Sequence, residues 1–130
     1  MDGSKIGRIV WTDLTVPGDA AEVASFYEKV CGWRRGEVPM GDYSDYSMHA
    51  GDPTKQETCV GGVCHARGSN AKMPPVWMVY VQVEDAAAAA RAAEENGGAI
   101  VDGPRPMGGH TFAVVRDPAG AHFGLISGGS

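Results

Sequence analysis

The stretch Trp11-Thr-Asp-Leu-Thr-Val16, followed by Pro17-Gly18, decides the fold of this 130-residue chain. Its side chains alternate, so Leu14 and Val16 fall on one face of a strand while Trp11, Asp13 and Thr15 fall on the other. The apolar face predicts a helix packed against it, and the mixed face predicts a more polar environment. Pro17-Gly18 ends the strand.

A helix is predicted directly after this strand. Asp19, followed three residues later by Glu22, is typical of a helix N-terminus. The apolar residues then recur with the period of one helix face, and Gly32 ends the pattern. They are Val23, Phe26, Tyr27 and Val30.

The second half of the chain repeats the first at an offset near 66 residues, which predicts an internal duplication. Five matches occur in one order along the chain. They pair Trp11–Val16 with Met78–Val83, Asp19–Ala21 with Asp85–Ala87, Cys31-Gly32 with Asn96-Gly97, Met40-Gly41 with Met107-Gly108, and Asp52-Pro53 with Asp117-Pro118.

Each half is therefore predicted to hold one strand, one helix and three further strands. The expected strands cover 10–16, 33–38, 43–49 and 59–65, then 77–83, 99–101, 110–116 and 121–126. This indicates an α+β fold of two tandem βαβββ modules in a single domain, with half-modules at about 7–65 and 76–127. A Gly-, Ser- and Pro-containing linker, 66–75, joins them.

Composition narrows the class of protein. A net charge of −5 disfavours nucleic acid as a partner, and no apolar run approaches the length of a membrane span, so we expect a soluble protein. The three cysteines form no Cys-x-x-Cys pair, which favours reduced thiols in the cytoplasm over a disulfide framework or a zinc site.

The Phe26-Tyr27 and Gly32-Trp33 pairs, and the closing segment Asp117-Pro-Ala-Gly-Ala-His-Phe-Gly124, resemble the glyoxalase/bleomycin-resistance/extradiol dioxygenase (vicinal oxygen chelate) superfamily. The resemblance covers about residues 9–126. It implies that the modules form a cup-shaped mixed β-sheet with the helices outside, enclosing a pocket. It also implies a homodimer.

Members of this superfamily that bind metal take ligands from the first and last strands of each module. The resemblance places these positions on Trp11, on Met78 or Trp77, on Gly61 or Gly62, and on Gly124. None of these side chains suits a divalent cation. We therefore expect no metal at the family site and no cofactor.

Residues on the face away from the helices are the predicted site. Those expected to bind a ligand are Trp11, Tyr46, Met48, Met78, Tyr80, His110, Phe112 and Gly124, with Tyr43 as a further wall residue. Alternatively, Trp11 and Met78 fill the space of the metal, and Tyr43, Tyr46, Met48 and Phe112 only pack. His110, beside Gly108-Gly109, lies either on a mobile lip or in solvent.

Two arrangements would support catalysis. Asp13 and His122 could act as a carboxylate-imidazole pair for proton abstraction, although a surface or structural histidine is the simpler reading of His122. A displaced metal site built from His49, His65, His110 or His122 is the other arrangement.

The function expected from the sequence is binding or sequestration of a small aromatic or amphipathic compound. The alternative is a lyase, isomerase or dioxygenase that uses a displaced metal site or the Asp13 and His122 pair. A regulatory or scaffold role with a filled pocket is the third hypothesis.

Overall fold

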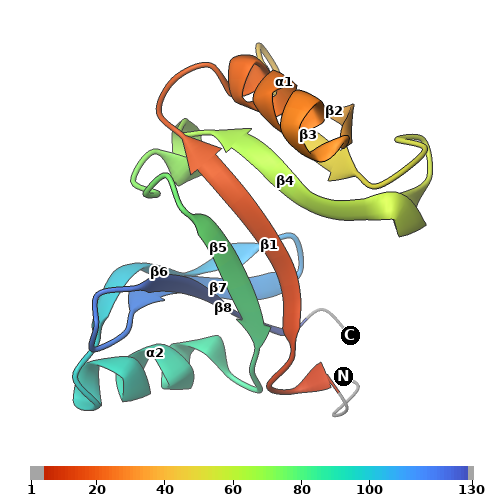
Figure 1. Ribbon diagram of the computed structural model, residues 1–130. Coiled ribbons are helices and arrows are strands. Elements are labelled where there is room, and N and C mark those ends of the chain that lie inside the picture. Colours follow the sequence, from red (N-terminus) through yellow and green to blue (C-terminus); the bar gives the residue numbers. More distant parts are fainter. Residues whose placement is uncertain (1–4, 129–130) are drawn as a thin grey trace. The chain divides into compact units, whose positions relative to one another are not determined.

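A computed structural model describes residues 5–128, and the chain divides into two compact units. The first unit comprises residues 12–77. The second unit comprises residues 78–130 together with the N-terminal residues up to Trp11. The described part of the chain contains two α-helices and eight strands, which Figure 1 labels.

The first unit contains β1 (Ile9–Val16, from Thr12 onward), α1 (Ala20–Cys31), β2 (Arg34–Pro39), β3 (Ser44–His49) and β4 (Cys59–His65). The strands follow the order β2-β3-β4-β1. β1 runs parallel to β4, and the other pairs are antiparallel. Helix α1 contacts β2, β3 and β4 and covers one face of this sheet (Figure 1).

The second unit repeats this plan with β5 (Trp77–Gln82, from Met78 onward), α2 (Ala86–Glu95), β6 (Ala99–Met107), β7 (His110–Arg116) and β8 (His122–Gly128). Its strands follow the order β5-β8-β7-β6, with β5 parallel to β8 and the rest antiparallel. The predicted α+β class and the repeated βαβββ order are confirmed. That the sheet forms a cup stays a prediction.

Strand β6 is longer than the sequence indicates. The expected strand 99–101 ends before Gly103, Pro104 and Pro106, but β6 extends to Met107. Its pairing with β7 shifts register on both sides of Asp102, and these irregularities accommodate the glycine and the first proline. Since β6 pairs only with β7 in its unit, its other edge tolerates proline.

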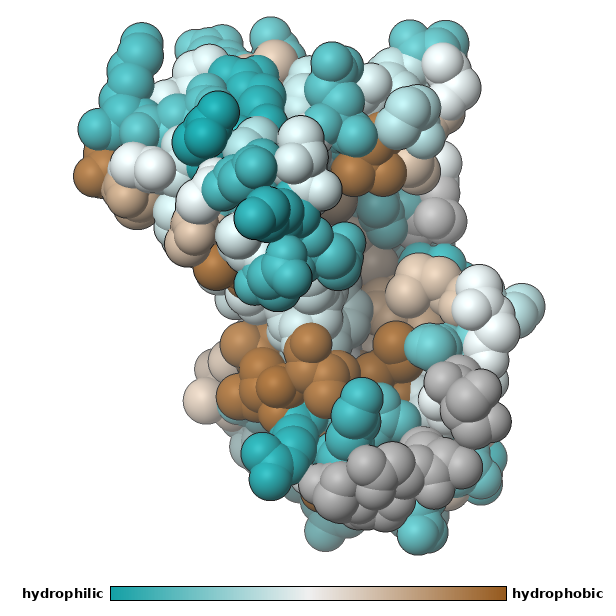
Figure 2. All heavy atoms as spheres, turned by 90° about the vertical axis from the view of Figure 1, so that its right-hand side faces the viewer, coloured by the Kyte–Doolittle hydropathy of each residue, from teal (hydrophilic) through white to brown (hydrophobic). Residues whose placement is uncertain are grey.

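Several large apolar side chains remain exposed. In the second unit they include Ile6, Ile9, Val10, Trp11 and Met107. Figure 2 shows brown side chains gathered in its lower half. No helix among residues 5–128 is long and apolar enough to span a membrane.

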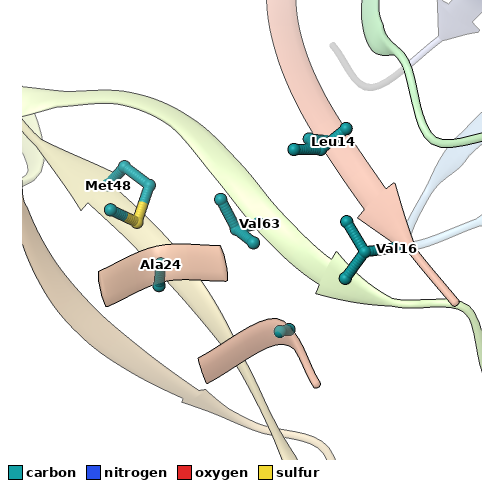
Figure 3. Packing of buried hydrophobic residues seen from close by; sticks show 6 residues of the cluster. Leu14, Val16, Ala24, Met48 and Val63 are labelled. Carbon is teal, nitrogen blue, oxygen red and sulfur yellow. The ribbon is translucent and has the colours of Figure 1, made fainter. Parts of the chain in front are cut away.

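The core of the first unit lies between α1 and its sheet. Leu14 and Val16 of β1 form one buried cluster with Ala20 and Ala24 of the helix and with Met48 and Val63 of the sheet. Figure 3 shows Leu14, Val16, Ala24, Met48 and Val63 of this cluster. Leu14 and Val16 thus occupy the helix-facing side that their alternation predicts. The predicted stripe of α1 is only partly buried, because Phe26 and Val30 are exposed.

The core of the second unit is built in the same way from smaller residues. Ala86 and Ala90 of α2 are fully buried against Ala113, Val115 and Leu125 of the sheet. Alanine side chains allow the helix to approach the strands closely. The small helix residues therefore leave room for the larger side chains of Val115 and Leu125, and the two layers pack closely.

Both helices begin at the predicted aspartates, and each is also tied to the last strand of its unit. The Asp19 and Asp85 side chains accept from backbone N–H groups of the first turn. In addition, Ala20 N–H donates to His65 Nε2 at 3.1 Å, and Ala86 N–H donates to Ser127 Oγ at 2.9 Å. Two different side chains thus satisfy equivalent helix donors.

His65 has a defined tautomer as a result. Its Nε2 accepts from Ala20, while its Nδ1 lies 3.3 Å from Asp45 Oδ1, a carboxylate oxygen that also accepts from the His65 backbone N–H at 2.8 Å. The proton of the neutral ring is therefore on Nδ1. This arrangement ties α1, β3 and β4 together.

We predict that His65→Ala destabilises the protein by about 1–2 kcal/mol, because the Ala20 N–H loses its acceptor and Asp45 loses a donor. Urea unfolding followed by far-UV circular dichroism measures the change. His122→Ala, which removes another half-buried imidazole, is the control and should cost less. Equal losses for the two variants would contradict this role of His65.

Candidate functional site

The face of the second unit's sheet that α2 leaves uncovered is called here the helix-free face. Ala113, Val115 and Leu125 point toward α2, so their neighbours along the strands point the other way. Strand pairing aligns Tyr80 with Gly124, Val114 with Gly124, and Phe112 with Ile126. Tyr80, Phe112 and Gly124, three residues of the predicted site, therefore share the helix-free face.

Tyr80 lies directly over Gly124. A Cβ atom added at Gly124 would lie 2.4 Å from Tyr80 Cδ2 and 2.7 Å from Cε2, closer than real Cβ contacts allow. The same ring stacks on Phe112, with centroids 5.5 Å apart and planes inclined by 29°. The absence of a side chain at position 124 is thus what lets the phenol ring lie across β8.

Arg105 extends this cluster from β6. Its Cζ lies 4.9 Å from the centroid of the Phe112 ring, and Nε and Nη2 both lie 3.1 Å from Asp102 Oδ2. The ring is only 2% exposed, so this face presents the guanidinium more than the ring itself. Sequence reasoning missed Arg105 because the strand was expected to end at residue 101. The period-two spacing of Arg105 and Met107 was the available signal.

His110 shares this face at the β6–β7 hairpin, two residues before Phe112 and directly opposite Met107. Its ring nitrogen Nδ1 is buried and has no hydrogen-bond partner. Leaving a buried polar group unpaired costs about 1–3 kcal/mol.

The corresponding face of the first unit is polar. One row across its four strands contains Gly36, Ser47, Gly62 and Asp13. Ser47 Oγ lies 2.8 Å from His49 Nε2, and His49 Nδ1 lies 2.8 Å from Thr58 Oγ1. Both ring nitrogens of His49 are therefore already in hydrogen bonds.

Cys64 lies between two acidic side chains of this unit. Desolvation of the half-buried thiol, followed by the charges of Asp13 and Asp45, raises the pKa of Cys64 to about 12. The group is therefore a neutral thiol at physiological pH. It is a poor nucleophile and a poor metal ligand.

The remaining predicted residues lie in different environments. Met48 is fully buried in the core beneath α1, which favours the packing alternative for this residue over ligand binding. Tyr46 packs against the same core, with Arg35 Cζ 5.2 Å from its ring centroid, and Tyr43 lies 4.1 Å from Arg67 Cζ. These three residues are in the first unit.

In the second unit, Met78 and Phe112 are nearly fully buried, which favours the packing alternative for them as for Met48, and Trp11 is exposed. Asp13 belongs to the first unit and half-buried His122 to the second, where His122 pairs with Arg116. Their action as an acid-base pair stays a prediction.

A hollow of about 300 Å³ in the second unit is lined by other residues, including Gly98, Arg116 and Pro118.

Comparison with known protein families shows which superfamily the chain belongs to. The family model of the Glyoxalase/Bleomycin resistance protein/Dioxygenase superfamily matches residues 6–125. The chain belongs to this superfamily, as the sequence motifs predicted.

Curated relatives agree with this placement. The chain is 32% identical over 127 residues to CFP32 of Mycobacterium bovis, a protein named as a glyoxylase, and the match covers 95% of this chain and 45% of that protein. It is 31% identical over 134 residues to the anthracycline biosynthesis protein DnrV of Streptomyces peucetius, covering 92% and 46%. The chain thus spans about half the length of these relatives.

Solved structures support the fold. A variant of methylmalonyl-CoA epimerase from Streptomyces coelicolor matches with a TM-score of 0.56 at 13% identity, covering 96% of this chain and 99% of that one. The hypothetical protein BH1468 from Bacillus halodurans matches with a TM-score of 0.58 at 13% identity, covering 95% and 96%. At this identity the likeness concerns the fold alone.

We predict that Gly124→Ala destabilises the protein by about 1–3 kcal/mol, because the new methyl group collides with the Tyr80 ring. Gly18→Ala is the control, since a Cβ there meets nothing within 4 Å. In a Tyr80→Ala background the Gly124→Ala change should cost much less. Urea unfolding of the four variants measures this coupling, and additive losses would contradict the contact.

We also predict that Cys64 resists alkylation in the folded protein, because its raised pKa leaves almost no thiolate at pH 8. Exposed Cys31 is the internal reference. Peptide mass spectrometry after brief iodoacetamide treatment compares the two rates. Modification of Cys64 as fast as Cys31 would disprove the environment described for it.

Proposed function

We propose that this protein is a small-molecule-binding member of the glyoxalase superfamily that works without the family metal. The observation that carries the proposal is the Tyr80 ring over Gly124. Where the family resemblance places a metal ligand, this chain has no donor atom, and an aromatic ring occupies the space a longer side chain would need. The site is built for organic contacts instead.

The other expected ligand positions support the same conclusion. Trp11, Met78 and Gly61 supply no carboxylate, imidazole or thiolate. A Cβ at Gly61 would lie 2.9 Å from the Thr12 carbonyl oxygen, so this position has no room for a larger side chain. These residues do not fit a divalent cation, and we derive no catalytic step through one.

A displaced metal site has little support from the histidines of the first unit. His49 and His65 each use both ring nitrogens in hydrogen bonds. Within either unit's described residues, no three His, Cys, Asp or Glu side chains gather closely enough to hold an ion. Binding is therefore the function that the geometry supports best.

The class of ligand is proposed from the second unit's helix-free face and from the relatives. The stacked Tyr80 and Phe112 rings and the exposed indole of Trp11, all in the same unit, suit a compact aromatic or amphipathic compound. The 31% identity to an anthracycline biosynthesis protein agrees with an aromatic compound. Sequestration of such a compound is the role we propose.

Assembly and location are parts of the same proposal. We propose a homodimer, which agrees with the several large apolar side chains that the described residues expose. The three cysteines are free, which agrees with a reducing cytoplasm.

The proposal predicts that 2-naphthamide, a neutral aromatic probe, binds saturably and raises the melting temperature, because a ligand of the folded state stabilises it. Tyr80→Leu should abolish the shift, and Tyr43→Leu, in the first unit, should leave it unchanged. A thermal-shift titration measures both. A response that persists in Tyr80→Leu would place the site elsewhere.

Metal analysis provides an independent check. Protein purified without chelators should contain far less than one equivalent of any divalent metal by inductively coupled plasma mass spectrometry. A stoichiometric ion that survives dialysis would overturn the proposed mechanism.

A further inference from the structure

The C-terminal end of α2 carries a reactive pair of residues that the proposed binding function does not use. Asn96 is the C-cap of the helix, Gly97 follows it, and both are exposed. An asparagine side chain reacts most readily with the next backbone nitrogen when the next residue is glycine, because no Cβ hinders the approach. We propose that Asn96 is a site of spontaneous deamidation and that the reaction opens the last turn of α2.

The chemistry needs only water. The Gly97 nitrogen attacks Cγ of Asn96, and the new N–Cγ bond closes a five-membered succinimide ring. The Cγ–Nδ2 bond breaks, and the amide group leaves as ammonia with the proton that the Gly97 nitrogen gives up. Water then opens the ring at either carbonyl, which leaves aspartate or isoaspartate at this position.

The attacking nitrogen is not held by a hydrogen bond. Nothing within residues 5–128 accepts from Gly97 N–H, whereas the N–H groups of Asn96 and Gly98 both donate to the Ala93 carbonyl, at 3.2 and 2.8 Å. The Gly97 nitrogen can therefore turn toward a neighbouring side chain without losing a partner.

The helix end must open before the ring can close. Asn96 has a ψ of 28°, which turns the Gly97 nitrogen away from Cβ, so the reaction requires rotation about the Cα–C bond of Asn96. The Asn96 side chain must also leave the Ala92 carbonyl, to which its Nδ2 donates at 2.7 Å. The rate of deamidation thus reports how often this turn opens.

Opening of this turn breaks few contacts. Glu94 and Glu95 are exposed, as Asn96 is, and Ala93 is the nearest residue that packs against the core of the unit. Exposed helix ends open locally at a small fraction of the free energy of global unfolding. The reactive conformation is therefore accessible from the folded protein.

Deamidation removes the group that closes the turn. A carboxylate at this position cannot donate to the Ala92 carbonyl, and its oxygens repel that acceptor. Its negative charge also opposes the helix dipole at a C-terminus and follows Glu94 and Glu95 directly. The last turn of α2 should therefore stay open once the reaction has occurred.

The chain supplies a matched internal reference. Asn70 is its other asparagine, and it is followed by Ala71, whose Cβ hinders the attack. The Ala71 N–H also donates to the Gly68 carbonyl at 3.2 Å. Asn70 lacks both features that make Asn96 reactive, so it should deamidate more slowly.

The first experiment incubates the folded protein in mildly alkaline buffer and follows both asparagines by peptide mass spectrometry. The Asn96 peptide should convert to aspartate and isoaspartate forms at least about tenfold faster than the Asn70 peptide, a barrier difference of about 1.4 kcal/mol. Asn96→Gln should stop conversion at this position, because a longer side chain must close a larger ring. The same incubation in urea gives the rate without the fold.

Conversion of Asn96 in urea but not in the folded protein would overturn the proposal, since the helix end would then protect the pair. Equal rates for Asn96 and Asn70 in the folded protein would also overturn it.

The consequence for α2 is tested by amide hydrogen exchange. Asn96→Asp, which makes one of the two products directly, should speed exchange severalfold in the last turn of α2 and leave α1 unchanged. Asn70→Asp introduces the same charge outside α2 and should leave exchange in α2 as it is. Unchanged exchange in Asn96→Asp would contradict the opening of the turn.

Discussion

The structure depends on one constraint: a single helix can cover only one face of a four-stranded sheet. In each unit, the residues that alternate toward the helix form the core, and those that alternate away form a second surface. Leu14 and Val16 illustrate the first group, and Tyr80 and Phe112 the second. Duplication of this plan gives the chain two helix-free faces that are free to evolve different chemistry.

The two faces have indeed diverged. The first unit places Asp13, Asp45, Ser47 and the neutral Cys64 on its face. Ser47 and Asp45 are used in hydrogen bonds within the unit, and the charges of Asp13 and Asp45 disfavour the Cys64 thiolate. The second unit places aromatic rings and one restrained arginine there. The latter combination resembles a site for an organic ligand, and the former resembles a polar structural network.

Much of the fold could be predicted because its signals are local. The alternation of residues 11–16, the aspartates at the helix starts and the repeated turn residues determine the order of elements. β6 was predicted too short, since Gly103, Pro104 and Pro106 read as a strand end, whereas the structure accommodates them through register shifts. The only local signal for the continued strand was the period-two spacing of Arg105 and Met107.

The site was harder to predict because it depends on pairing between distant strands. Sequence alternation placed Tyr80 and Gly124 on one face, but the Tyr80 ring over Gly124 requires the β5–β8 register. Arg105 was missed with the end of β6. For Met48 the sequence left both a wall position and simple packing open, and the residue packs under α1. Alternation assigns a face, but only tertiary packing shows whether that face is filled.

The most direct test of the account is backbone amide NMR of the ¹⁵N-labelled protein during titration with 2-naphthamide. The largest shifts should fall on Tyr80, Phe112 and Gly124, with little change in α2. Shifts concentrated around the hollow beside Gly98 and Pro118, or no saturable change at all, would contradict a binding site on the helix-free face of the second unit.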